Sequence, residues 1–201
     1  MKKIIFFSIG LFVSVVSVAQ LKVTDVRTEN RVDPVGIDVN VPRFSWTLQS
    51  DKRNVKQTAY EIIVKQSKNI VWNSGKVVSD ASIHVSYNGQ PSQSGNRYSW
   101  QVRIWDNQGN QSAWSPMANY TIALLNPSQE FIAQWISSGL KGDTTFGIVP
   151  QFRKSFSAKN KIASATAYIT AKGVYETHIN GKRIGDAFLT PGWTAYQKRL
   201  L

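Results

Sequence analysis

The sequence contains no cysteine among its 201 residues. Disulfide bonds and thiolate-ligated metal sites are therefore excluded, and the chain has to be held together by burial of its core. Histidine is almost absent too. His84 and His178 are the only two, and they show none of the short spacings that place two imidazoles on one metal ion. The sequence therefore predicts no metal site.

Acidic residues are half as numerous as basic ones, 12 against 24, which gives a formal net charge of +12. The basic residues are spread along the chain in pairs such as Lys52-Arg53 and Lys182-Arg183, with no longer run. A nucleic-acid interface needs a clustered basic patch, so we expect no nucleic-acid partner. The spacing predicts an ordinary solvated surface. The alternative is a diffuse positive field that favours approach to an acidic polysaccharide.

Long hydrophobic runs are also missing, apart from one at the N-terminus. Lys2 and Lys3 precede an apolar stretch over residues 4–16, and Ser17-Val18-Ala19 forms a small-x-small cleavage site before Gln20. This is the pattern of a secretory signal peptide, residues 1–19. The stretch is shorter than the ~20 residues that span a bilayer. We expect export to the periplasm or beyond without stable membrane insertion, the alternative being an uncleaved anchor.

Residues 20–125 read as a β-sandwich of the fibronectin-III or immunoglobulin-like type. Short segments of alternating polarity recur with turn residues between them, which is typical of all-β domains. The strands are expected at residues 21–28, 43–48, 59–65, 70–72, 82–87 and 98–104, with a last strand opening at 112–115. Tyr98 stands where such sandwiches place a corner tyrosine. Most of the aromatic residues are expected in the core.

Residues 164–196 predict a β-hairpin followed by a loop that carries aromatic residues. Residues 164–171 alternate between alanine or isoleucine and polar residues, the period of a strand with one apolar face. Residues 174–179 lead into Asn180-Gly181, the pair best suited to a two-residue type I′ turn. Thr190-Pro191-Gly192-Trp193 then leaves the sheet.

The residue identities in this segment are more specific than its predicted secondary structure. The string G-x-Y-E…I-N-G-K-R-I-G-D…L-T-P-G-W-T-x-Y-x-K-R, residues 173–199, closely resembles the N-terminal β-sandwich region of bacterial α-L-rhamnosidases. Residues 131–136 and 150–156 also resemble the first strands of that domain. The resemblance implies an all-β chain, in which the first sandwich is followed over residues 126–201 by a truncated jelly-roll-like β-sandwich. A further strand is expected at residues 196–201, where the chain stops.

In that family the chemistry is carried by a helical barrel that follows these sandwiches. The resemblance therefore implies that the chain is the non-catalytic N-terminal portion of an exported, inverting glycoside hydrolase that releases terminal α-L-rhamnose. Its two catalytic carboxylates would lie beyond Leu201, and its sandwiches would dock on the missing C-terminal domains. The alternative is a non-catalytic glycan-binding or adhesive protein built of tandem sandwiches.

No catalytic residue is expected in the chain itself. Glycosidases use two carboxylates on opposite sides of the scissile bond. Glu176 and Asp186 are close in sequence, but across an Asn180-Gly181 turn they would occupy neighbouring ladder positions on opposite faces. A G-x-S-x-G motif is absent. No cofactor is expected. Some sandwiches of these enzymes resemble calcium-dependent rhamnose binders, but no acidic loop here supports calcium.

Sugar binding is the more reasonable local function of the hairpin and its loop. An aromatic ring packs on the C–H face of a sugar while planar polar side chains bind its hydroxyl groups. We expect Trp193, Asp186, Asn180 and Tyr196 to contact a rhamnose-containing glycan. The alternative is that Trp193 fills the sandwich core or docks on the catalytic barrel.

Overall fold

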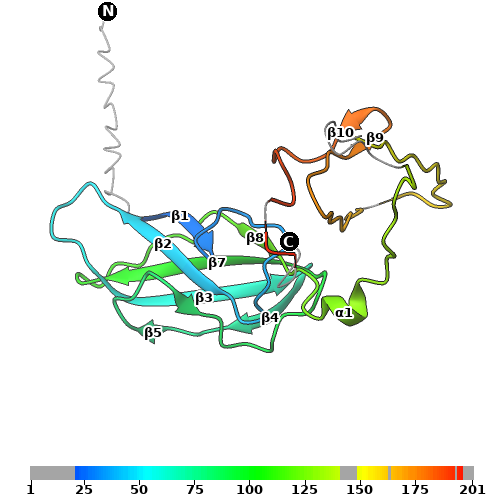
Figure 1. Cartoon of the computed structure of the whole chain (residues 1–201). Coiled ribbons are helices and arrows are strands. Elements are labelled where there is room, and N and C mark those ends of the chain that lie inside the picture. Colours follow the sequence, from blue (N-terminus) through cyan, green and yellow to red (C-terminus); the bar gives the residue numbers. More distant parts are fainter. Residues whose placement is uncertain (1–20, 141–148, 163, 193, 197–201) are drawn as a thin grey trace, which may run out of the picture. The chain divides into compact units, whose positions relative to one another are not determined.

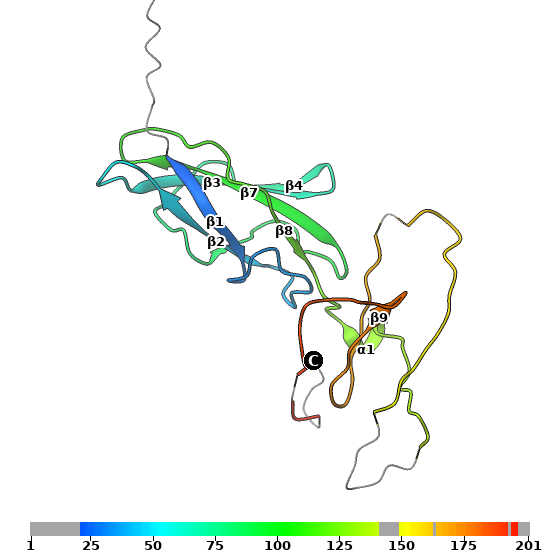
Figure 2. The same ribbon diagram turned by 90° about the horizontal axis from the view of Figure 1, so that it is seen from above.

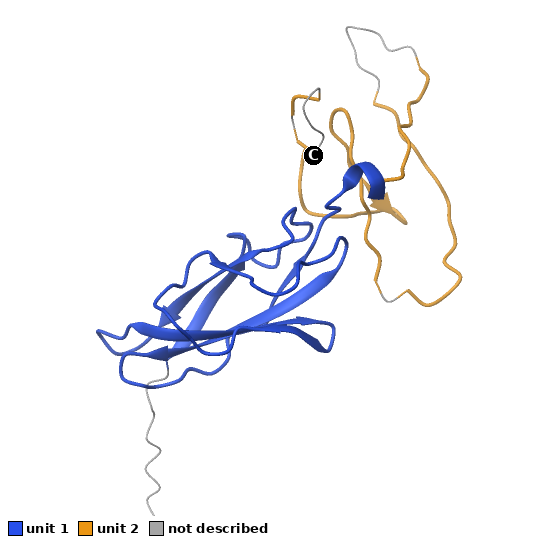
Figure 3. Cartoon of the chain, turned by 90° about the horizontal axis from the view of Figure 1, so that it is seen from below, with its two compact units in different colours: residues 1–130 blue, residues 131–201 orange. Residues whose placement is uncertain are grey.

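The computed structural model describes residues 21–140, 149–162, 164–192 and 194–196. The chain divides into two compact units, residues 1–130 and residues 131–201, which are called unit 1 and unit 2 below (Figure 3). The regular structure of the described residues is almost entirely β-strand, and the predicted all-β fold is confirmed. In this part of the chain no helix is long and apolar enough to cross a bilayer.

Unit 1 is a sandwich of two antiparallel sheets (Figure 1). The smaller sheet has the order β1-β2-β6, and the larger has the order β4-β3-β7-β8 with β5 paired to β3. Figure 2 shows β1 and β2 side by side on one layer. The strands are β1 (Lys22–Thr28), β2 (Arg43–Gln49), β3 (Gln57–Gln66), β4 (Asn69–Asn73), β5 (Val77–Val78), β6 (Val85–Ser86), β7 (Arg97–Asp106) and β8 (Ala118–Thr121).

The core lies between the two sheets because each long strand alternates apolar and polar residues. On β7 the side chains of Tyr98, Trp100, Val102 and Ile104 are buried, as the alternation predicts. Phe44 of β2 stacks on Trp100 with a centroid distance of 4.3 Å, which joins the two sheets. The buried residues that pack together in one core cluster are Leu21, Val23, Ile37, Phe44, Trp46, Ile62, Val64, Tyr87, Tyr98, Trp100, Val102, Ile104, Ala118, Tyr120 and Ile122.

Tyr98 has the geometry of a corner tyrosine. Its ring is buried, and its hydroxyl accepts a hydrogen bond from the backbone N–H of Gln93 at 3.0 Å, five residues upstream. Such a bond ties the loop that enters the strand to the strand itself. The prediction that Tyr98 is a corner tyrosine is confirmed.

Two of the predicted strands in unit 1 are wrong in extent. Residues 82–87 contain only the two-residue β6, because β6 pairs with Arg43 and Phe44 alone. Residues 112–115 are not a strand, and the last strand is β8. The segment still runs along β7. The backbone N–H groups of Ser112 and Ser115 donate to the carbonyls of Ile104 and Val102, and their hydroxyl oxygens accept from the N–H groups of the same two residues. Hydroxyl oxygens thus replace the carbonyls of a regular ladder.

Unit 1 ends with α1 (Pro127–Glu130), a single helical turn. In the described part of unit 2, β9 (His178–Ile179) and β10 (Lys182–Arg183) are the only strands. They form a hairpin whose two turn residues, Asn180 and Gly181, both have positive φ, 52° and 77°. The predicted type I′ turn at Asn180-Gly181 is therefore confirmed in its defining feature.

Other strands predicted in unit 2 are wrong for the described residues. Residues 131–136, 150–156, 164–171 and 174–177 have no strand assignment. No described residue of unit 2 is buried, so the alternating apolar side chains of 164–171 have no facing layer to pack against. Three of these four apolar residues are alanines, which bury little area, so the pattern alone gives a weak driving force. Residues 197–201, within the other predicted strand, lie outside the described residues.

Candidate functional site

Two of the four residues predicted to contact sugar, Asn180 and Asp186, lie on or just after the hairpin of unit 2. Asn180 is exposed at the turn, Asp186 is exposed just after β10, and Tyr196 is half-buried. No hydrogen bond joins these three side chains to one another in the described part of the chain. Trp193 lies outside the described residues. The structure thus brings two polar groups to one hairpin, and the four-residue sugar site stays a prediction.

The base of the loop that leads toward Trp193 is fixed to the preceding segment. The backbone N–H of Tyr175 donates to the carbonyl of Thr190 at 2.7 Å, and the Thr190 hydroxyl donates to the carbonyl of Tyr175 at 3.2 Å. Tyr175 also donates its own hydroxyl to the carbonyl of Ile169 at 3.2 Å. These bonds position the start of the predicted sugar-binding loop beside the hairpin.

Glu176 is engaged by basic neighbours on the same hairpin. One carboxylate oxygen lies 3.3 Å from Nε2 of His178, and the other lies 3.5 Å from Nε of Arg183. Arg183 in turn places its guanidinium 4.1 Å from the ring centroid of Phe188 and donates to the carbonyl of Ala187. Asp186 is not part of this cluster. That Glu176 and Asp186 do not act as a catalytic pair stays a prediction.

Metal ligation finds no support in the described residues. Within them no group of three or more histidine or acidic side chains could hold a cation. His84 and His178 lie in separate parts of the fold, and each has another partner. His84 Nε2 lies 2.9 Å from Oδ1 of Asn30, and His178 pairs with Glu176.

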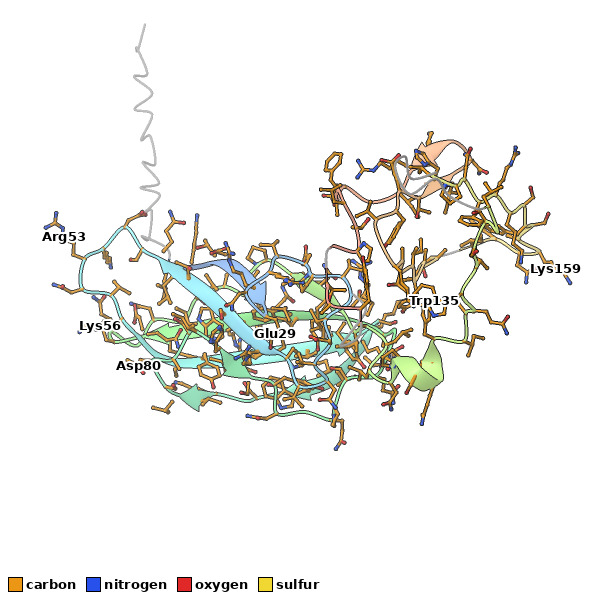
Figure 4. All side chains as sticks on the ribbon, viewed as in Figure 1. Glu29, Arg53, Lys56, Asp80, Trp135 and Lys159 are labelled. Carbon is orange, nitrogen blue, oxygen red and sulfur yellow. The ribbon has the colours of Figure 1, made fainter. Side chains whose placement is uncertain are left out.

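Trp135 is an exposed indole that the sequence reasoning did not single out as a binding residue. Its side chain in unit 2 is 58% exposed, and Lys172 lies over its ring at 5.5 Å (Figure 4). The signal in the sequence was weak, because an isolated Trp in an A-x-W-I segment reads as a strand residue. An exposed indole is a usual partner for the apolar face of a sugar.

A second arrangement that the sequence did not reveal lies on the outer face of the larger sheet in unit 1. The Arg103 guanidinium lies 4.6 Å from the ring of Trp114 and 5.4 Å from that of Trp105. The Lys76 ammonium covers Trp105 at 4.5 Å. Arg103 also bonds Glu61 of β3, with nitrogen–oxygen distances of 2.6 and 2.7 Å. We call Lys76, Trp105, Arg103 and Trp114 the cation–aromatic ladder.

Comparisons with known proteins now place both units. A family model described as the Rha78A-like, N-terminal immunoglobulin domain matches residues 23–126, which is more than half of the chain. A second model, the α-L-rhamnosidase N-terminal domain, matches residues 160–201. The chain belongs to the Rha78A-like family of N-terminal immunoglobulin domains, and its resemblance to the N-terminal region of α-L-rhamnosidases is confirmed.

Individual relatives agree with these models. The chain is 36% identical over 186 residues to an α-L-rhamnosidase of Formosa agariphila, and the match covers 86% of this chain and 20% of the relative. The solved α-L-rhamnosidase of Dictyoglumus thermophilum matches 89% of the chain with 34% identity and a TM-score of 0.76, over 22% of its own length. The Streptomyces avermitilis α-L-rhamnosidase solved with L-rhamnose matches 54% of the chain with 39% identity and a TM-score of 0.52, over 11% of its own length.

The extent of these matches is as informative as their identity. The chain spans about a fifth of the length of the curated α-L-rhamnosidases that it matches. That fifth is their N-terminal portion, with an immunoglobulin-like domain first and the start of the rhamnosidase N-terminal domain after it.

Proposed function

We propose that this chain is the non-catalytic N-terminal portion of an exported α-L-rhamnosidase, an inverting hydrolase of terminal α-L-rhamnose. The observation that carries the proposal is the order of the two family matches, residues 23–126 and then 160–201, together with their N-terminal place in the relatives.

Export is part of this proposal and rests on the N-terminal sequence. Two lysines, a 13-residue apolar stretch over residues 4–16 and Ser17-Val18-Ala19 have the order of a signal peptide. The absence of cysteine does not oppose export, because unit 1 has a continuous apolar core that needs no covalent bridges. The protein would then act in the periplasm or outside the cell.

We further propose that unit 2 docks on the domains that follow it in the longer enzyme. The support is the exposure of its large apolar side chains, which in a folded protein are usually covered. Ile132 is 89% exposed, Val149 is 93% exposed and Phe156 is 77% exposed. A complementary apolar surface from the rest of the enzyme would bury them.

The most detailed part of the proposal is that the hairpin and its loop contact a glycan. It assigns Trp193, Asp186, Asn180 and Tyr196 to a rhamnose-bearing polysaccharide. In the full-length enzyme, Trp193→Ala should weaken polysaccharide binding roughly fivefold, the cost of about 1 kcal/mol for one aromatic–sugar contact, and leave the melting temperature nearly unchanged. A large loss of melting temperature with unaltered glycan affinity would instead identify Trp193 as a core or docking residue.

The simplest test of the whole proposal is to read the genomic sequence past codon 201. Several hundred further in-frame codons with the pattern of a helical barrel are the expected result. A stop codon with no in-frame continuation would contradict the enzyme and favour the alternative, a non-catalytic glycan-binding or adhesive protein.

A further inference from the structure

A groove on unit 1 lies beside the smaller sheet, and none of the residues considered so far for sugar contact lines it. Its volume is about 410 Å³, which is within the usual range for small-molecule sites. Asp25 and Arg27 of β1 line one side, Ser82 and Ile83 line the other, and β2 contributes residues between them, including Thr47.

Two irregularities in the backbone border this groove. The pairing of β1 with β2 shifts register between Thr24 and Arg27, and Asp25 adopts a left-handed conformation with φ of 47°. Such a bulge re-aims the side chains that follow it. On the other side, β6 ends after pairing with Arg43 and Phe44, so β2 runs on without a regular neighbour. The segment at Ser82 fills that place only in part.

The walls of the groove are held by hydrogen bonds that do not need a ligand. The backbone N–H of Trp46 donates to the carbonyl of Ser82 at 2.9 Å, and the backbone N–H of His84 donates to the hydroxyl of Ser45 at 3.0 Å. His84 is also linked through its ring to Asn30, which lines the groove. The site is therefore pre-organised, which lowers the entropic cost of binding.

An ion pair fixes the end of the groove nearest Asn30. Glu29, labelled in Figure 4, accepts from the Arg43 guanidinium at 2.6 Å and from the Arg43 backbone N–H at 2.7 Å. These hydrogen bonds from Arg43 hold the pKa of the Glu29 carboxyl below its usual value. Glu29 is thus committed to a structural role and leaves the neighbouring Asn30 to face the groove.

The charges inside the groove cancel. Asp25 and Arg27 are its only charged lining residues, and Arg27 Nε lies 2.9 Å from Oδ1 of Asp25. An anion such as phosphate would meet the Asp25 carboxylate, and a cation would meet the Arg27 guanidinium. A neutral ligand avoids both of these like-charge repulsions.

The remaining polar groups suit hydroxyl groups. A carboxylate, a guanidinium and an amide are planar and can each bind two neighbouring hydroxyls. The Thr47 hydroxyl and the Asn30 amide nitrogen have no hydrogen-bond partner among the residues that the structure describes. The Ile83 side chain, 71% exposed, and Leu48 supply an aliphatic surface for C–H or methyl groups. Trp46 is only 3% exposed, so its ring is not an open stacking platform.

We propose that this groove binds one neutral sugar residue of a glycan, with Asp25, Arg27, Asn30 and Thr47 on its hydroxyl groups. The inference goes beyond the proposed function, because it needs no hydrolytic activity and concerns the other unit of the chain. Affinity for a single sugar is expected in the millimolar range, since the site is open and lacks an exposed aromatic ring. Such a weak site would act by holding the enzyme near its polymer.

The test is an NMR titration of the purified chain with methyl α-L-rhamnopyranoside. Saturable amide shifts are expected at Asp25, Arg27, Thr47 and Ile83. Arg27→Gln should weaken binding roughly tenfold, because it removes a charged donor. Thr47→Val keeps the β-branched shape of an exposed strand residue and should weaken binding roughly threefold. Arg97→Gln, at an exposed arginine on β7, is the matched control and should bind as the unaltered chain does.

Several results would overturn the proposal. They are the absence of saturable shifts, equal binding by all three variants, or shifts confined to unit 2. Tighter binding of inorganic phosphate than of the glycoside would show an anion site instead. If Arg27→Gln fails to fold, Thr47→Val decides the question, because it changes one hydroxyl that makes no internal hydrogen bond in the described chain. Loss of rhamnosidase activity in the longer enzyme would not affect this readout.

Discussion

At the scale of single residues, Arg103 combines aromatic and ionic contacts on the surface of unit 1. It is held between the rings of Trp105 and Trp114 and forms the ion pair with Glu61. Glu61 is only 8% exposed, so loss of Arg103 would leave its side chain without this ion-pair partner in a largely buried position. A cation–π contact is worth up to about 1 kcal/mol at a partly exposed site, and a desolvated ion pair adds to it.

Replacing Arg103 with methionine should therefore lower the free energy of unfolding by about 2 kcal/mol. The methionine keeps apolar contact with the two indoles but leaves the Glu61 carboxylate without its partner. Urea denaturation of the purified chain measures the change. Arg97→Met is the matched control, because Arg97 is exposed on the same strand and should change stability by less than about 0.5 kcal/mol. Equal effects of the two substitutions would contradict this view of the cation–aromatic ladder.

At the scale of elements, β7 is the centre of unit 1. It pairs with β3 through eight residues of register and with β8 through four. Beyond β8 the neighbour of β7 is the irregular segment 112–115. There the hydroxyl oxygen of Ser115 accepts from the N–H of Val102 at 3.1 Å, and that of Ser112 accepts from the N–H of Ile104 at 3.0 Å. These two donors lie in the buried part of the strand.

Ser112→Ala and Ser115→Ala should each destabilise unit 1 by about 1–3 kcal/mol, because each leaves a buried backbone N–H without an acceptor. Chemical denaturation followed by tryptophan fluorescence measures the effect. Ser86→Ala changes an exposed serine on β6 and is the control, with an expected effect below about 0.5 kcal/mol. If the three substitutions behave alike, the hydroxyl groups are not the acceptors that complete β7.

At the scale of the whole molecule, the two units differ in how they are stabilised. Unit 1 buries fifteen apolar residues in one cluster. The described part of unit 2 has no buried residue and only one two-stranded hairpin. A two-stranded hairpin without a covering layer is at best marginally stable in water.

Limited proteolysis of the chain should therefore leave a resistant core over residues 21–130. Cleavage is expected in unit 2, because its described residues include no buried side chain and only one two-stranded hairpin. Mass spectrometry of the fragments locates the cuts. Early cleavage inside β3 or β7, or a single resistant species that extends through unit 2, would contradict this difference between the units.

Much of unit 1 could be predicted from the sequence, because its alternating strands form a complete core. Residues 98–104 are one example, where every second side chain is buried as expected. The groove could not be predicted, because the bulge at Asp25 and the segment at Ser82 are far apart in sequence and meet only in the fold. The cation–aromatic ladder could not be predicted either. Lys76 and Arg103 are far apart in sequence, and the sequence predicts a strand at Trp114 that does not form.

In unit 2 the sequence pattern predicted a turn correctly but a strand incorrectly. The Asn180-Gly181 turn was predictable because its two positive φ values depend on local chemistry. The strand at 164–171 was not, because alternation produces a strand only when a second layer covers its apolar face. A family resemblance carried by side-chain identity was more reliable here than periodicity.

The central claim is that the chain is the non-catalytic beginning of an α-L-rhamnosidase. The most direct measurement compares the purified chain with the full-length gene product in hydrolysis of an aryl α-L-rhamnoside. The full-length protein should release rhamnose and the chain alone should show no turnover above background. Turnover by the chain itself that is abolished by Glu176→Gln or Asp186→Asn would contradict the account.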